Sequence, residues 1–192
     1  MDVASVTTMQ HMLRKLAPLA LLSLAALSGC GGADGSDGTS GSADSELTNG
    51  NEKIAFEYFV GKGLSETQAA AIVGNLQQES TVNPHSVQQG GPGRGIAQWS
   101  VGARWNVTTD DNLASFAKNE GASPLSLETQ LGFIWYELEN FPRYGLSSLQ
   151  DARTITAATV AFQKDFEACG ACNSTHRVAY ARAVLAAYGS GQ

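Results

Sequence analysis

Apolar residues recur at helical spacing through most of the chain after residue 50. The first group predicts a short helix that ends near Gly61 and Gly63, and it consists of Ile54, Phe56, Phe59 and Val60. Ser65 and Gln68 then have the spacing of a capping box, in which each side chain satisfies a free backbone donor at a helix start. A second helix is therefore predicted to continue over residues 69–80, with its apolar residues on one face.

The same spacing predicts three further helices. Ser123 and Pro124 indicate a helix start, because serine caps free amide groups and proline fits the first helical turn. The apolar residues that come after it at helical spacing are Leu127, Leu131, Ile134, Trp135 and Leu138. Residues 155–166 and 177–188 fit two more helices.

A stretch rich in glycine and proline interrupts this helical pattern. Residues 81–95 are predicted to form a loop, because Asn83-Pro84 and the glycines at 90, 91 and 93 cannot continue a helix. Residues 95–99, Gly-Ile-Ala-Gln-Trp, then predict a short strand or extended segment. The expected fold class is therefore mainly α (α+β), with one small β-hairpin region.

The apolar run at residues 16–27 is shorter than the roughly 20 residues that a membrane-spanning helix needs. Arg14 and Lys15 precede it, and Leu27-Ser28-Gly29-Cys30 closes it with small residues, which is typical of an export signal. These last four residues resemble the lipobox of bacterial lipoproteins, in which the cysteine is acylated. Residues 1–30 are thus predicted to be a lipoprotein signal peptide, with Met12 as an alternative start. The other interpretation is a buried helix of the fold.

After Cys30 the composition changes sharply. Residues 31–50 are mostly glycine, serine and acidic residues with no aromatic residue, which is typical of a flexible tether. Residues 51–192 are then long enough to form one compact domain. An acylated Cys30 would hold that domain on a lipid bilayer without a spanning segment.

Charge excludes some partners. The chain has 192 residues and a formal net charge of -6, with 12 Lys and Arg against 18 Asp and Glu. Because the basic residues form no cluster, the sequence argues against a nucleic-acid partner. The tether contains four of the acids and no base, so the domain itself is only mildly acidic.

Two strings of residues resemble the phage tail lysozyme family. They are Gly74-Asn75-Leu76-Gln77-Gln78-Glu79-Ser80 and Gly95-Ile96-Ala97-Gln98-Trp99, and the resemblance extends over residues 51–188. At longer range the chain is similar to goose-type lysozymes and soluble lytic transglycosylases, whose catalytic glutamate also ends a helix in a Glu-Ser pair. The resemblance implies a lysozyme-like helical domain with a hairpin beside its cleft. It also implies cleavage of the β-1,4 bond between N-acetylmuramic acid and N-acetylglucosamine in peptidoglycan.

Glu79 is the candidate catalytic residue. Cleavage of a glycosidic bond needs a carboxylic acid that stays protonated beside the leaving oxygen. A position beside apolar Leu76 at the C-terminal end of a helix would favour the protonated form. The alternative interpretation is a solvated carboxylate at a helix end.

A second carboxylate is harder to identify, because residues 81–95 contain no Asp or Glu. The candidates are Asp110, Asp111, Glu137 and Glu167. With one of them orienting water, the enzyme is a hydrolase. With Glu79 alone, it is a lytic transglycosylase in which the sugar's own 6-hydroxyl closes on the anomeric carbon. A third hypothesis is a peptidoglycan-binding lipoprotein that kept the groove and lost turnover.

Supporting roles fall to nearby residues. Gln98 is expected to hydrogen-bond the sugar, and Ser80 is expected to contact substrate or to hydrogen-bond at the helix end. Trp99 is equally compatible with stacking on a sugar ring and with packing in the core. Arg104 is predicted to pair with a carboxylate near the cleft or to lie on the surface.

Cys169 and Cys172 are predicted to form a disulfide, since export and acylation of Cys30 leave one pair in an oxidising compartment. A free pair, a metal site and a thiol-disulfide oxidoreductase are the alternatives. His85 and His176 do not complete a convincing zinc set with these cysteines, so no metal and no cofactor are expected.

The expected location depends on the signal. The protein is predicted to be exported and lipid-anchored, with the outer membrane and periplasm preferred, because Gly31 stands where enteric bacteria place an aspartate for inner-membrane retention. We expect a monomer that acts on peptidoglycan, either of its own wall or of a rival cell's.

Overall fold

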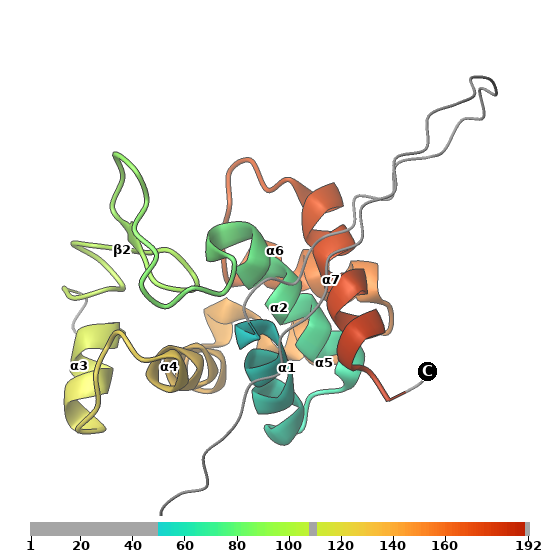
Figure 1. The fold of residues 1–192 in the computed structure, drawn as a ribbon, viewed down its shortest axis with the longest axis horizontal. Coiled ribbons are helices and arrows are strands. Elements are labelled where there is room, and N and C mark those ends of the chain that lie inside the picture. The colour runs from blue at the N-terminus through green and yellow to red at the C-terminus, as the bar shows by residue number, and fades with distance from the viewer. Residues whose placement is uncertain (1–49, 108–110, 191–192) are drawn as a thin grey trace, which may run out of the picture. The chain divides into compact units, whose positions relative to one another are not determined.

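The computed structural model describes residues 50–107 and 111–190. The helices are α1 (Asn51–Gly61), α2 (Glu66–Ser80), α3 (Leu113–Asn119), α4 (Leu127–Asn140), η1 (Pro142–Tyr144), α5 (Leu146–Asp151), α6 (Ile155–Asp165) and α7 (Ser174–Tyr188), where η1 is a 3-10 helix. β1 (Gly93–Arg94) and β2 (Trp99–Ser100) pair antiparallel, with Gly93 opposite Ser100. The prediction of a mainly helical fold with one small β-hairpin is confirmed (Figure 1).

Helix α2 lies at the centre of the described part and packs against α1, α6 and α7 (Figure 1). Its predicted capping box is present: the Ser65 hydroxyl accepts a hydrogen bond from the Gln68 amide, and the Gln68 side chain accepts one from the Ser65 amide. Every residue from Ala69 to Gln77 is buried. Because many of its residues are small, the neighbouring helices approach α2 closely and bury it on all sides.

Asn75 joins three of these helices through buried hydrogen bonds. Its Nδ2 donates to the carbonyl of Ala71 in α2 and to that of Thr159 in α6. Its Oδ1 accepts from Arg177 in α7 at 3.1 Å. Because a buried polar group without a partner is costly, these bonds fix the relative positions of α2, α6 and α7.

Helix α4 supports the other side of the molecule. The apolar residues predicted to share a face, Leu127, Leu131, Ile134, Trp135 and Leu138, are all buried. Gln130 in the same helix is also fully buried, and its Oε1 accepts a hydrogen bond from the Ile96 amide at 2.8 Å. Its Nε2 donates to the carbonyls of Pro84 and Pro124. The Gln130 side chain therefore attaches both the loop, at Pro84, and the hairpin turn, at Ile96, to α4.

Helix boundaries differ from the prediction: α6 ends at Asp165, one residue earlier, and α7 begins at Ser174, three residues earlier. Helix α4 begins at Leu127 with Ser126 as its cap, not at Ser123 and Pro124, which lie in the preceding turn. The Ser126 hydroxyl accepts from the Thr129 amide, whereas the Pro124 carbonyl is bound by Gln130. Ser123 and Ser126 are both possible caps by sequence. Because the Pro124 carbonyl accepts a hydrogen bond from the buried Gln130 side chain, Pro124 lies in the turn before the helix.

The segment 95–99 is not a strand over its length. Residues 95–98 form the turn between β1 and β2, and only Trp99 belongs to a strand. Gly95 and Gln98 both have positive φ, which closes this turn. The predicted loop 81–95 accordingly contains β1 near its end. The short helices α3 and α5 were not predicted, because seven and six residues are too few for a clear periodic pattern.

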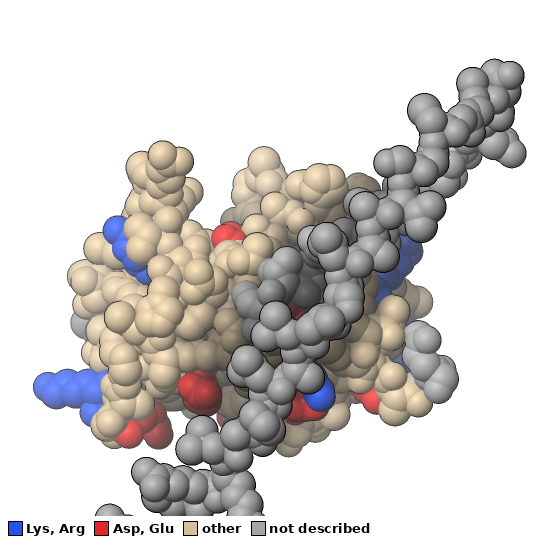
Figure 2. All heavy atoms as spheres, viewed as in Figure 1, with Lys and Arg blue, Asp and Glu red and all other residues tan. Residues whose placement is uncertain are grey.

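The described part of the chain contains no helix long and apolar enough to cross a membrane. On the face shown in Figure 2, basic and acidic side chains are scattered among uncharged residues. The predicted signal, Cys30 and the tether up to residue 49 lie outside the described residues.

The close contact of α2 and α7 predicts that Gly74→Ala destabilises the protein. A Cβ at this position would lie 2.5 Å from the Ala181 amide nitrogen and 2.6 Å from its Cβ, so α7 would have to move. We expect a loss of about 1–3 kcal/mol in the free energy of unfolding, measured by urea denaturation. Gly61→Ala is the matched control, since a Cβ there would have no other atom within 4 Å and alanine favours the helix. An unchanged denaturation midpoint for Gly74→Ala would contradict this account of the helix contact.

Candidate active site

A cavity of about 550 Å³ opens beside the C-terminal end of α2. Its wall comes from the end of α2, from the hairpin with the segment after it, and from the loop between α6 and α7 (Figure 1). The residues around it include Glu79, Gln98, Trp99, Arg104, Glu167 and Cys169. Residues predicted separately from the sequence thus come together at one place.

Glu79, the penultimate residue of α2, is paired with Arg177 of α7. Nη2 of Arg177 donates a hydrogen bond to Oε1 of Glu79. The Glu79 side chain is 21% exposed, whereas that of Arg177 is only 5% exposed. The carboxyl group is therefore accessible from the cavity on one side and held by a buried cation on the other.

Arg177 was not singled out from the sequence as a site residue. Besides Glu79, its guanidinium donates to Asn75 and, through Nε, to the Cys172 carbonyl at 2.6 Å. A signal was present, because Val178, Ala181 and Val184 form the buried face of α7. A charged residue on an otherwise apolar helix face needs a partner in the interior.

Glu167 lies in the loop after α6 and lines the same cavity. Its Oε1 is buried and has no hydrogen-bond partner. Burial raises the pKa of Glu167, and the negative charge of Glu79 raises it further, whereas Arg104 and Arg177 act in the opposite direction. Of the four candidate second carboxylates, Glu167 is the one placed in the cavity with Glu79 among the described residues.

Glu137 is placed behind the cavity wall and is fully buried. Arg104 binds it with both forks of the guanidinium: Nε donates to Oε1 and Nη2 to Oε2, each at 2.7 Å. Oε2 also accepts from the Trp99 indole at 3.1 Å. Since both carboxylate oxygens are occupied by these bonds, Glu137 positions Trp99 and Arg104 and does not face the cavity.

Arg104 is held by more than this ion pair. Its Nη1 donates to the Phe166 carbonyl at 3.1 Å, and its guanidinium stacks 4.4 Å from the Tyr144 ring centroid. Burial raises the pKa of Glu137 to about 8, although the bonds from Arg104 oppose this increase. Of the two placements considered for Arg104, the structure has the pairing with a carboxylate, and the partner is Glu137.

The three residues expected to support substrate binding are placed differently from one another. The Trp99 ring is 1% exposed and packs against Phe133, so it is not available to a sugar in this conformation. The Ser80 hydroxyl donates to the Ile96 carbonyl at 2.8 Å and attaches the hairpin turn to the end of α2. Gln98 lines the cavity, and its Nε2 donates to the Gly95 carbonyl. Gln98 is the one whose side chain remains at the cavity.

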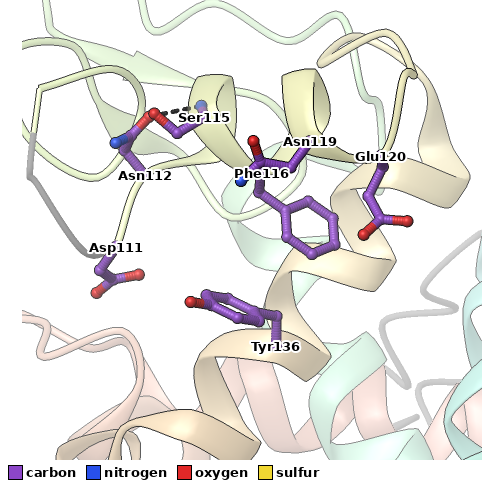
Figure 3. A pocket seen from close by; sticks show the side chains of 7 residues that line it. All are labelled: Asp111, Asn112, Ser115, Phe116, Asn119, Glu120 and Tyr136. Atoms are coloured by element: carbon purple, nitrogen blue, oxygen red, sulfur yellow. Dashed lines mark hydrogen bonds between the residues drawn. The ribbon is translucent and has the colours of Figure 1, made fainter.

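Asp111 is placed in a different pocket of about 240 Å³ between the start of α3 and α4 (Figure 3). It is buried and accepts hydrogen bonds from Arg143 at 2.7 Å and from the Tyr144 hydroxyl. Phe116 and Tyr136 form the far side of this pocket, with ring centroids 5.4 Å apart. Asp111 does not line the cavity with Glu79, and Asp110 lies outside the described residues.

Cys169 and Cys172 form a disulfide in the loop between α6 and α7. Cys169 lines the cavity, and the Cys172 carbonyl binds Arg177, so the disulfide closes the loop that carries Glu167. His85 and His176 are exposed. Within the described ranges, no three His, Cys, Asp or Glu side chains are arranged to hold a metal ion.

Comparison with known proteins adds one finding. A family model described as phage tail lysozyme matches residues 50–188, which include all the helices and the hairpin described above. No curated protein matches the chain.

The buried carboxyl groups predict that stability falls as pH rises. Glu137 and Glu167 have raised pKa values, so between about 4.5 and about 8 the folded protein binds more protons than the unfolded chain. The free energy of unfolding therefore decreases with pH across this range. We expect the Tm to fall by about 5 °C or more between pH 5 and pH 8, measured by circular dichroism.

Variants separate this effect from general pH sensitivity. Glu137→Gln cannot ionise and keeps an oxygen that can accept from Arg104, so its Tm should depend less on pH than that of the wild type. Glu139→Gln, an exposed change in the same helix, should keep the wild-type dependence. A wild-type Tm that is constant or rises between pH 5 and pH 8 would refute the assignment.

Proposed function

The chain belongs to the phage tail lysozyme family, and on that premise we propose that Glu79 is the general acid that cleaves the glycan strand of peptidoglycan. Membership supports a lysozyme-type glycosidase that acts on peptidoglycan. The bond proposed is the β-1,4 linkage between N-acetylmuramic acid and N-acetylglucosamine.

One observation carries the assignment of Glu79. Its partly exposed side chain lines a cavity of about 550 Å³, and a second carboxyl residue, Glu167, lines the same cavity. A cavity of this volume is in the range of small-molecule sites and can enclose sugar rings. Gln98 supplies an amide at the same cavity for hydrogen bonds to hydroxyl or N-acetyl groups.

The proposed reaction begins when the Glu79 carboxyl group donates its proton to the glycosidic oxygen. The bond between the anomeric carbon and that oxygen breaks, and its electron pair stays with the leaving oxygen. In a hydrolase, water then attacks the anomeric carbon and loses a proton to a carboxylate. Glu167 is the proposed acceptor, because it faces the same cavity.

The second candidate is a lytic transglycosylase that uses the same acid. In this reaction the 6-hydroxyl of the muramic acid residue attacks the anomeric carbon and gives its proton to Glu79, which has just donated its own to the leaving oxygen, so no water is needed. The observation in its favour is that the loop at residues 81–95, directly after Glu79, contains no acidic residue to orient water.

Glu79→Gln is expected to lower the rate of cleavage at least about 10²-fold, because the amide cannot donate an acidic proton. The measurement is mass spectrometry of soluble products from purified peptidoglycan treated with wild-type or variant protein. Products with a reducing end identify a hydrolase, and products lighter by one water with a 1,6-anhydro ring identify a transglycosylase.

Glu139→Gln is the control and should release products at the wild-type rate, since Glu139 is exposed and does not line the cavity. Full activity of Glu79→Gln would exclude Glu79 as the acid. Binding of peptidoglycan without products, from wild type and variant alike, would instead identify a binding lipoprotein that lacks turnover.

We propose in addition that the chain is a lipoprotein of the bacterial envelope. The support is the sequence alone: basic residues, an apolar run and the Leu27-Ser28-Gly29-Cys30 ending. Acylation of Cys30 would anchor the protein to a membrane, with the outer membrane preferred, and residues 31–50 would let the domain reach peptidoglycan.

Cys30→Ser is expected to remove the lipid anchor. In bacterial cells, the wild-type protein should incorporate a labelled fatty acid and sediment with membranes, whereas the variant should do neither. The control is the double variant Cys169→Ser, Cys172→Ser, which retains Cys30 and should still be labelled. Equal labelling of Cys30→Ser and the wild type would rule out this site of acylation.

A further inference from the structure

The buried guanidinium of Arg177 spans one turn of α2. Asn75 and Glu79 are four residues apart in this helix, so their side chains lie on the same face, and both contact α7. Nη1 of Arg177 donates to Oδ1 of Asn75 at 3.1 Å, and Nη2 donates to Oε1 of Glu79. One side chain therefore connects the buried part of α2 with the residue proposed as the acid.

The guanidinium is held in place from several sides. Its Nε donates to the Cys172 carbonyl at 2.6 Å, so the loop before α7 holds it as well. Arg177 and Ala181 share a face of α7, and a Cβ at Gly74 would lie 2.5 Å from the Ala181 amide nitrogen, so α2 and α7 approach very closely there. Only 5% of the Arg177 side chain is exposed. The carboxyl group of Glu79 is therefore oriented against a group whose own position is fixed.

The two oxygens of the Glu79 carboxyl group have different surroundings. Oε1 accepts the hydrogen bond from Arg177. Oε2 makes no hydrogen bond within the described part of the chain, and it is not a buried atom. Since the side chain is 21% exposed and lines the cavity, Oε2 is the oxygen left for a molecule that binds there.

The chemistry of the guanidinium favours one of these oxygens as the site of the proton. Arginine has N–H donors and no acceptor, whereas a protonated carboxyl group has one hydroxyl donor and one carbonyl oxygen. The carbonyl oxygen is the better acceptor, and a hydroxyl at Oε1 would bring its hydrogen toward a group that has only donors. In the protonated form of Glu79 the proton is therefore favoured on Oε2. In the ionised form Oε2 is the oxygen free to take up a proton, so both forms give Oε2 the same role.

On the proposed function of Glu79, we propose that Arg177 is the positioning residue that makes Oε2 the reacting oxygen of Glu79. By binding Oε1, Arg177 holds the carboxyl group so that Oε2 faces the glycosidic oxygen of a glycan in the cavity. Arg177 does not itself line the cavity, so it acts through Glu79.

The proton then follows the same route in both proposed reactions. It leaves Oε2 and bonds to the glycosidic oxygen, whose bond to the anomeric carbon breaks with the electron pair on oxygen. Oε1 keeps its bond to Arg177 throughout, so the charge that develops on the carboxylate has a donor already in place. Because the carboxyl group is oriented before the glycan binds, no rate is lost to a search among its rotations.

The test compares two replacements of Arg177 that each end in a single polar group. Arg177→Lys and Arg177→Gln both lose the fork that reaches Asn75 and Cys172, so both lower stability. They differ because the lysine ammonium has only donors, whereas the glutamine amide also has an acceptor, which permits a proton on the oxygen beside it.

We expect Arg177→Gln to lower kcat on soluble glycan strands of peptidoglycan at least about 10-fold, with KM within about twofold of the wild type. Arg177→Lys should keep a kcat at least about threefold higher than that of Arg177→Gln, since a donor still faces Oε1.

Arg182→Gln is the control, because Arg182 is an exposed residue of α7 that does not line the cavity. Its kcat and KM should equal those of the wild type. A wild-type kcat for Arg177→Gln would overturn the proposal. Equal kcat values for the two Arg177 variants would overturn it as well, because loss of packing alone predicts that result.

A crystal structure covers the case in which the Arg177 variants do not fold. The protein is Glu79→Gln, which keeps Arg177 and the shape of the side chain, and the probe is a soluble tetrasaccharide of alternating N-acetylglucosamine and N-acetylmuramic acid. The side-chain atom that contacts the oxygen between two sugars should be the one that is not bound to Arg177. Contact through the atom that Arg177 binds, or a side chain that has left Arg177, would contradict the proposal.

Failure of the proposed function has a separate signature. Cleavage by Glu79→Gln at the wild-type rate excludes Glu79 as the acid, whatever the Arg177 variants do. If Glu79→Gln is inactive while the two Arg177 variants have equal kcat values, only the role of Arg177 is excluded.

Discussion

The buried guanidinium of Arg177 is the contact on which the cavity depends. It binds Glu79 and Asn75 at the end of α2 and the Cys172 carbonyl in the loop before α7. Three segments that are far apart in the sequence therefore meet at one side chain. A buried cation stabilises such a junction only when its partners are all in place, so the position of the carboxyl group and that of the loop are linked.

A second group of buried polar contacts builds the opposite wall. Gln130 holds the Ile96 amide, Ser80 holds the Ile96 carbonyl, and Glu137 holds Trp99 and Arg104. The hairpin has only two residues in each strand, and so short a sheet has little stability of its own. Its position beside α2 comes from these side chains, which explains why the wall that faces Glu79 is formed by polar contacts to α2 and α4.

The sequence predicted the local features of this structure and not its long-range pairs. The capping box at Ser65, the helix that carries Glu79 and the apolar face of α4 depend on neighbours within a few residues, so periodicity reveals them. The choice of Ser126 over Ser123 as a cap depends on Gln130, and the burial of Trp99 depends on Glu137, 38 residues away. Arg177 lies 98 residues from Glu79, and no local pattern reports that distance. The sequence identifies Glu167 as one of four acidic candidates. It does not show which of the four shares a cavity with Glu79, because that depends on the tertiary structure.

The pairing of charges bears on the choice between the two proposed reactions. Both need one proton at Glu79. The two reactions differ in the group that attacks the anomeric carbon. Glu167 lies in the same cavity, and Arg104 and Arg177 favour its carboxylate form. A carboxylate in that place can accept the proton of an attacking water, which is the task that the loop after Glu79 leaves unfilled for lack of an acid. Glu167 is therefore the carboxyl group on which the proposed hydrolysis depends, whereas the proposed transglycosylase reaction needs Glu79 alone.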